Sequence, residues 1–128
     1  MKKNNILIVD DSVEFRRQLK KFLLSENEIN VVGEASNGKQ AVAEVLKLKP
    51  DIVLMDVSMP VLNGLEATKQ ILVKMPEARV VMLSIYDIEE YKQAAEETGA
   101  VGYVIKKSVV NELLPTIRRV LLNGKIKR

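Results

Sequence analysis

The chain contains no cysteine and no histidine among its 128 residues. Without cysteine it can form no disulfide, no thiolate nucleophile and no thiolate metal site. Without histidine it has no imidazole base, no imidazole metal ligand and no phosphohistidine of its own. Any acid–base or metal chemistry must therefore use carboxylates, lysines, tyrosines and hydroxyl groups.

Tryptophan and long hydrophobic runs are also absent. No apolar run approaches the ~20 residues that cross a membrane, and the apolar residues after the basic N-terminus stop at Val9, which is too short for a signal peptide. We therefore expect a cytoplasmic protein with no membrane partner. The formal charge of +3 is mild, and no aromatic residues are interleaved with the basic ones. The basic residues, Arg16 among them, are accordingly interpreted as solvated helix faces and not as a nucleic-acid site.

The apolar run from Ile52 to Met55 leads directly into Asp56 and is bounded by charged and turn residues. Such a run predicts a strand that is buried on both faces, as in a parallel sheet covered by helices. Similar runs predict strands over residues 5–9, 79–83 and 101–105, and a more polar edge strand over residues 31–35.

Amphipathic segments separate these strands and predict five helices. Asp11 or Ser12 can cap the first helix, and the pairs Asn37-Gly38 and Asn63-Gly64 are turn signals. The helix over residues 87–98 has an inner side of small residues, so it should be the least firmly held. The last helix is expected to close at Asn123-Gly124 and to place these residues on its inner face: Val110, Leu113, Leu114, Ile117 and Leu121. Pro115 requires either a late start near Asn111 or a kink.

This alternation predicts one α/β domain with right-handed crossovers. The strands that end at Asp10, Asp56 and Ser84 are the most apolar and should be central. The expected fold is a flavodoxin-like five-stranded parallel sheet of order 2-1-3-4-5, with five helices on both faces.

Parallel strands bring their carboxyl ends to one edge of the sheet, which gathers Asp10, Asp11, Asp56, Ser84 and Lys106. Carboxylates repel by roughly 4 kcal/mol per pair at 4 Å and an effective dielectric near 20. Lys106 or a divalent ion must offset this repulsion. Hard oxygen ligands favour Mg²⁺.

A carboxylate beside Mg²⁺ and a lysine is a nucleophile suited to a phosphoryl group. The metal and the lysine would neutralise charge on the transferring oxygens, and the Ser84 hydroxyl could bond one of them. A single Asp after a strand is usually a helix cap or a turn residue. Matching chemistry at four strand ends favours a functional site.

The motifs now assembled are Ile8-Val-Asp-Asp11, Met55-Asp-Val-Ser-Met-Pro60 with Asn63-Gly64, Leu83-Ser84, and Gly99-Ala-Val-Gly-Tyr-Val-Ile-Lys106. With them the chain resembles, over essentially its whole length, the receiver domain of two-component response regulators. The resemblance implies that Asp56 accepts a phosphoryl group from a partner histidine kinase. It implies that Mg²⁺ is held by Asp10, Asp11, Asp56 and the backbone carbonyl of Ser58. It further implies that Ser84 and Lys106 bind phosphoryl oxygens and that Tyr103 is the switch aromatic.

Three positions qualify the resemblance. Many family members carry proline after the lysine, in a cis peptide, whereas this chain has Lys107, so we expect a trans bond there. Family members commonly orient the hydrolytic water with side chains two residues after the phosphorylated Asp and two after the Ser. Here these are Ser58 and Tyr86, neither of which is a carboxylate or a carboxamide. We therefore expect a long-lived phosphoryl group.

Details such as Asn63-Gly-Leu-Glu-Ala67 look most like receivers that precede a LuxR-like helix-turn-helix domain. The expected function is a signalling switch that is not an enzyme. It would control transcription through a DNA-binding domain outside these residues and could form a homodimer on phosphorylation. Residues 1–124 would form the receiver, and residues 125–128 would begin a linker or C-terminal tail.

Three alternatives compete with this expectation. The first is a stand-alone regulator that acts by protein contact. The second is an aspartyl phosphatase of the haloacid-dehalogenase type, which expects Asp where this chain has Ser58. The third is an FMN carrier, whose phosphate the pair Asp10-Asp11 would repel.

Overall fold

A computed structural model describes residues 3–126 of the chain, and side chains as far as Asn123. Strands and helices alternate along these residues as the hydrophobic pattern predicts. The strands are β1 (Asn4–Val9), β2 (Ile29–Ala35), β3 (Ile52–Asp56), β4 (Val80–Ser84) and β5 (Gly102–Ile105). The helices are α1 (Val13–Leu24), α2 (Gly38–Leu48), α3 (Gly64–Lys74), α4 (Glu89–Glu97) and α5 (Val109–Ile126), with a 3₁₀ turn, η1 (Lys106–Ser108), before the last.

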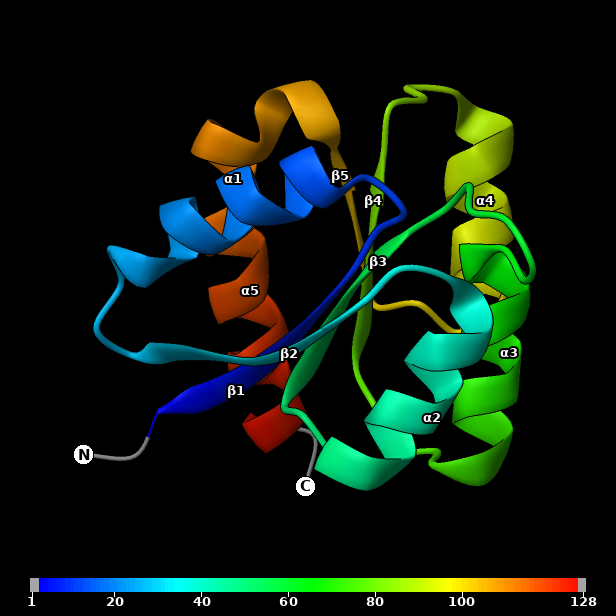
Figure 1. The fold of residues 1–128 in the computed structure, drawn as a ribbon, viewed down its shortest axis with the longest axis horizontal. Coiled ribbons are helices and arrows are strands. Elements are labelled where there is room, and N and C mark those ends of the chain that lie inside the picture. The colour runs from blue at the N-terminus through cyan, green and yellow to red at the C-terminus, as the bar shows by residue number, and fades with distance from the viewer. Residues whose placement is uncertain (1–2, 127–128) are drawn as a thin grey trace.

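The strands form one parallel sheet in the order β2-β1-β3-β4-β5, which confirms the predicted topology (Figure 1). The three most apolar strands, β1, β3 and β4, occupy the centre, and the more polar β2 lies at an edge. At the carboxyl edge, Val9 pairs with Met55, Asp56 with Leu83, and Ser84 with Ile105. This register places the predicted site residues side by side.

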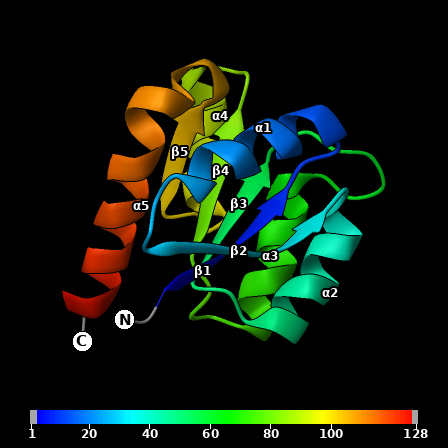
Figure 2. The ribbon, with the colours of Figure 1, turned by 60° about the vertical axis from the view of Figure 1, so that its left-hand side comes forward.

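Helices cover both faces of the sheet and enclose two hydrophobic cores. On one face lie α1 and α5 (Figure 2). They bury Leu19, Leu23, Leu113 and Ile117 against the sheet. On the other face, α2, α3 and α4 contribute Ala41, Val45, Ile71 and Ala95, among others. Burial of large side chains on both faces gives the fold most of its stability.

Three helices begin at a side-chain cap. Ser12, Asn37 and Asn63 each accept a hydrogen bond from a backbone N–H three residues later, at 3.1, 2.9 and 2.9 Å. Asn37 and Asn63 therefore start helices, whereas the sequence indicated only turns at these positions. No side-chain cap bond starts α4, and Ala95 is its one buried residue, so α4 has the weak anchorage that its small residues predict.

The expectations for α5 were partly wrong. The helix begins at Val109, directly after the 3₁₀ turn, and continues to Ile126, past the expected end at Asn123-Gly124. Pro115 lies inside the helix and not in a late first turn. Most of the predicted inner face packs on the core, since Leu113 and Ile117 are buried and Leu114 and Leu121 are partly buried, but Val110 is 74 % exposed and Val120 is buried instead. Over the described residues, the helices are too short or too polar to span a membrane.

Candidate functional site

Three carboxylates meet at the carboxyl edge of the sheet. Asp10 follows β1, Asp56 ends β3, and Asp11 lies in the loop between β1 and α1. One oxygen from each lies within 4.8 Å of the others. Asp10 and Asp56 are buried and Asp11 is exposed, so the cluster opens to solvent on one side. Hard oxygens at this spacing could hold a divalent metal ion.

Lys106 supplies the cation that the cluster needs. Its Nζ lies 2.6 Å from Asp10 Oδ2 and 3.5 Å from Asp56 Oδ1. The same Nζ lies 4.3 Å from the centre of the Phe15 ring, a cation–π contact from α1. Asp10 also accepts a hydrogen bond on Oδ1 from the Ser12 N–H at 2.9 Å. These contacts fix both Asp10 and Lys106 in the described state.

Asp56 is held in an environment that disfavours its charge. Burial is the largest cause, followed by the negative charge of Asp10, and together they raise the pKa of the Asp56 carboxyl to about 6. The positive charge of Lys106 and a hydrogen bond from the Ser58 N–H act in the opposite direction on this pKa. A carboxylate with a raised pKa is more basic, which favours its use as a nucleophile or a metal ligand near neutral pH.

The loop from β3 to α3 passes very close to Asp56. A Cβ atom on Gly64 would lie 2.0 Å from the Asp56 carbonyl oxygen, so only glycine fits at this position. Ser58 is exposed in this loop. Val61 has φ = 70°, a left-handed conformation that is unusual for a β-branched residue. The loop is therefore defined by close backbone contacts.

All three tyrosines of the chain gather beside the end of β4. The Tyr103 hydroxyl donates to the Tyr86 carbonyl at 2.8 Å, and the Tyr86 ring stacks on Tyr91 with centroids 4.7 Å apart. Ser84, which is buried, accepts a hydrogen bond on Oγ from the Tyr86 N–H at 3.0 Å. Ser84, Tyr86 and Tyr103 thus form one connected group.

The structure brings the predicted residues together, and the peptide after Lys106 is trans as expected, since the described residues contain no cis bond. Sequence reasoning missed two contributors. Phe15, an apolar residue of the first predicted helix, faces the Lys106 ammonium, and nothing in the sequence indicated this contact. Arg16 was assigned to a solvated face, which is wrong: its side chain is only 13 % exposed and pairs with Glu34. No local pattern identifies either contact, because each joins distant parts of the chain.

Residues 6–118 match the family described as the response regulator receiver domain. The chain therefore belongs to this family of signalling domains from two-component systems. It is 38% identical over 122 residues to the transcriptional regulatory protein DegU of Brevibacillus brevis, covering 95% of this chain and 52% of that protein. The chain spans about half the length of curated relatives such as this one.

Solved structures agree with the family assignment. A LuxR-family two-component response regulator from Aurantimonas sp. SI85-9A1 superposes with a TM-score of 0.91 at 30% identity, covering 94% of this chain and 86% of that one. The response regulator domain of Thermotoga maritima CheB gives a TM-score of 0.88 at 37% identity, covering 94% and 97% of the two chains. The flavodoxin-like fold and the relation to LuxR-family regulators, both expected from the sequence, are confirmed.

Proposed function

We propose that Asp56 accepts a phosphoryl group from a phosphohistidine on a partner histidine kinase. The supporting observation is the environment of Asp56: it is buried at the end of β3, with the Lys106 ammonium 3.5 Å away and two further carboxylates within 4.8 Å. A buried carboxylate beside fixed positive charge is suited to phosphoryl transfer.

The metal in this proposal is Mg²⁺, held by Asp10, Asp11, Asp56 and the backbone carbonyl of Ser58. When bound, Mg²⁺ would neutralise negative charge on the phosphoryl oxygens. The supporting observation is the donor set, which consists of oxygens alone and suits a hard cation.

In the transfer step, an Asp56 oxygen forms a bond to phosphorus as the phosphorus–nitrogen bond of the donor breaks. The electron pair of that bond stays on the donor imidazole. Lys106 and the Ser84 hydroxyl each bind an oxygen of the transferred group. In this proposal the chain is no enzyme toward other substrates, because it promotes only its own phosphorylation and dephosphorylation.

The switch in this proposal couples Ser84 to Tyr103. Ser84 would turn its hydroxyl toward the phosphoryl group, which requires its hydrogen bond from the Tyr86 N–H to break. The Tyr103 hydroxyl donates a hydrogen bond to the carbonyl of Tyr86, so movement of the loop that carries Tyr86 would release the Tyr103 side chain. The weakly anchored α4 could then shift with little loss of buried area.

We further propose that the output is transcription, through a DNA-binding domain outside the 128 residues, in a cytoplasmic protein that dimerises on phosphorylation. The name of the DegU relative supports transcription. A stand-alone regulator that acts through protein contacts is the alternative.

We also propose that residues 1–124 form the receiver and that residues 125–128 begin a linker or C-terminal tail. Residues 127 and 128 lie outside the described part of the chain.

The test is to incubate the protein with a small-molecule phosphodonor and Mg²⁺ and to weigh it by intact-mass spectrometry. We expect one added phosphate, none in Asp56→Asn, and the normal gain in Asp87→Asn. Asp87 is a matched control because it is an exposed aspartate outside the carboxylate cluster. An Asp56→Asn variant that gains phosphate at the wild-type rate would contradict the proposal.

A further inference from the structure

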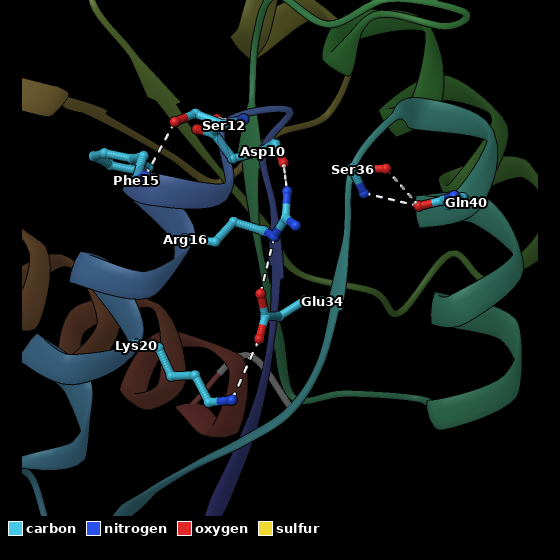
Figure 3. Close-up of polar contacts among 8 residues, drawn as sticks. All are labelled: Asp10, Ser12, Phe15, Arg16, Lys20, Glu34, Ser36 and Gln40. Carbon is cyan, nitrogen blue, oxygen red and sulfur yellow. Dashed lines mark hydrogen bonds and ion pairs between the residues drawn. The ribbon is translucent and has the colours of Figure 1, made fainter.

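Arg16 connects the loop after β1 to strand β2. Its NH1 group donates to the main-chain carbonyl of Asp10, and its Nε pairs with Glu34 Oε1 at 2.9 Å (Figure 3). The Arg16 side chain is 13 % exposed, whereas that of Arg17, the next residue, is 67 % exposed. The contact with the Asp10 carbonyl is therefore part-buried, which strengthens it, whereas Glu34 holds the guanidinium from the more exposed side.

The contact with the Asp10 carbonyl bears directly on Asp11. The peptide unit is planar, so a bond that fixes the carbonyl of Asp10 also fixes the nitrogen and Cα of Asp11. The Asp10 side chain is held independently by Lys106 and by the Ser12 N–H. Asp11 is the exposed member of the cluster, so packing does little to hold its side chain. Its position depends mainly on the backbone that Arg16 holds.

We propose that Arg16, anchored by Glu34, is a positioning residue for the divalent-metal site. It orients the Asp10–Asp11 peptide so that the Asp11 carboxylate stays near Asp10 and Asp56. This inference rests on the proposed function in one respect, namely that the three carboxylates hold the metal. A guanidinium suits the role because its planar fork can donate to two acceptors at once, which a lysine ammonium does less well.

The sign of the effect on Mg²⁺ binding separates positioning from simple electrostatics. Arg16 is a cation near a cation site, so loss of its charge alone would tighten Mg²⁺ binding. Loss of positioning would weaken it. We expect Arg16→Met to raise the dissociation constant for Mg²⁺ by about tenfold, a typical effect of removing a group that orients a metal ligand.

Lys20 provides a matched control. Its Nζ lies 3.3 Å from Glu34 Oε2, so it is a cation on the same helix that pairs with the same carboxylate (Figure 3). In Figure 3 the Lys20 ammonium contacts Glu34 and does not contact the Asp10 carbonyl. Lys20→Met should therefore leave Mg²⁺ binding unchanged or slightly tighter.

The experiment is a calorimetric Mg²⁺ titration of the full chain and its variants, with urea unfolding to verify folding. The NMR chemical shift of the Asp11 amide reports on the local backbone. It should change in Arg16→Met, whereas the amide chemical shifts of β4 and β5 should not. Glu34→Gln should weaken Mg²⁺ binding as well. The double variant should be no weaker than Arg16→Met alone, because the two residues act through one contact.

An Arg16→Met variant that is folded and binds Mg²⁺ as tightly as the wild type, or more tightly, would overturn the inference. If Arg16→Met does not fold, Glu34→Gln decides: unchanged Mg²⁺ binding in that variant overturns the inference as well. Asp11→Ala keeps the two proposals apart. If Asp11→Ala weakens Mg²⁺ binding and Arg16→Met does not, the metal site stands and only the positioning role fails. If Asp11→Ala leaves the titration unchanged, the metal site itself is lost, and the inference with it.

Discussion

The Lys106 ammonium lies closer to Asp10 than to Asp56, at 2.6 Å against 3.5 Å. Lys106 thus pairs with the buried carboxylate of Asp10, which the proposed metal site also needs as a ligand. Lysine and metal compete for the same negative charge, and binding of Mg²⁺ must shift Lys106 toward Asp56 or the phosphoryl group.

This competition predicts opposite effects of one substitution on binding and on chemistry. Lys106→Met should tighten Mg²⁺ binding by roughly fivefold, because the competing cation is gone, and should slow phosphorylation by at least about tenfold. Calorimetry and intact-mass kinetics measure the two effects. Lys107→Met is the control, since Lys107 is exposed and adjacent. Weaker Mg²⁺ binding in Lys106→Met would show that the lysine supports the metal site.

The raised pKa of Asp56 predicts how stability depends on pH without metal. Burial and then the charge of Asp10 raise this pKa from 3.8 to about 6, so the folded protein binds the proton more tightly than the unfolded chain does. Ionised Asp56 therefore opposes folding above about pH 6, and this effect fades as the pH falls toward 3.8.

Asp56→Asn should accordingly be more stable than the wild type at pH 7.5, by on the order of 2 kcal/mol, with a much smaller difference at pH 4.5. Urea unfolding in the presence of a chelator gives both values. An equal difference at the two pH values would mean that packing, and not ionisation, accounts for the stabilisation.

The left-handed backbone at Val61 predicts a stabilising substitution. Val61 has φ = 70° and is 76 % exposed, so its side chain contributes little burial in return for the strain. Val61→Asn should raise the free energy of unfolding by about 1 kcal/mol, because Asn tolerates this conformation. Val61→Gly should gain less, since glycine gives the unfolded chain more freedom.

Val73→Asn is the control for that measurement. Val73 is 81 % exposed in α3, and valine and asparagine have similar helix propensities, so stability should hardly change. Thermal unfolding compares the variants. If Val61→Asn is no more stable than Val73→Asn, the loop is not strained at this residue.

Ser58 and Tyr86 are predicted to set the lifetime of the phosphoryl group. Neither side chain can orient a hydrolytic water as a carboxylate or a carboxamide would, and the Tyr86 ring is stacked on Tyr91. Changing Ser58 to Asn and Tyr86 to Glu should accelerate dephosphorylation by about tenfold or more, because positioning lowers a barrier by several kcal/mol. The measurement is phosphoprotein decay after removal of the donor at fixed Mg²⁺. Equal decay rates of the wild type and the double variant would show that Ser58 and Tyr86 do not set the lifetime of the phosphoryl group.

The sequence predicted the sheet and most of the site because both depend on local signals. Unbroken apolar runs mark buried strands, and polar residues directly after them must lie at the carboxyl edge of a parallel sheet. The contacts of Lys106 with Phe15 and of Arg16 with Glu34 join separate elements, so side-chain periodicity gives no sign of them. The error at Val110 has a different origin: Val109 and Val110 are adjacent apolar residues at the start of α5, and the sequence does not decide which of them faces the core. In the structure Val109 packs against the core and Val110 is exposed.

The grouping of the tyrosines has a practical consequence. Because the chain has no tryptophan, its ultraviolet emission and most of its near-ultraviolet circular dichroism arise from Tyr86, Tyr91 and Tyr103. These rings all lie between the end of β4, α4 and β5. The unmodified protein therefore carries intrinsic spectroscopic probes in one region only, beside α4. Structural changes elsewhere should alter these optical signals only when they also change the surroundings of the tyrosines.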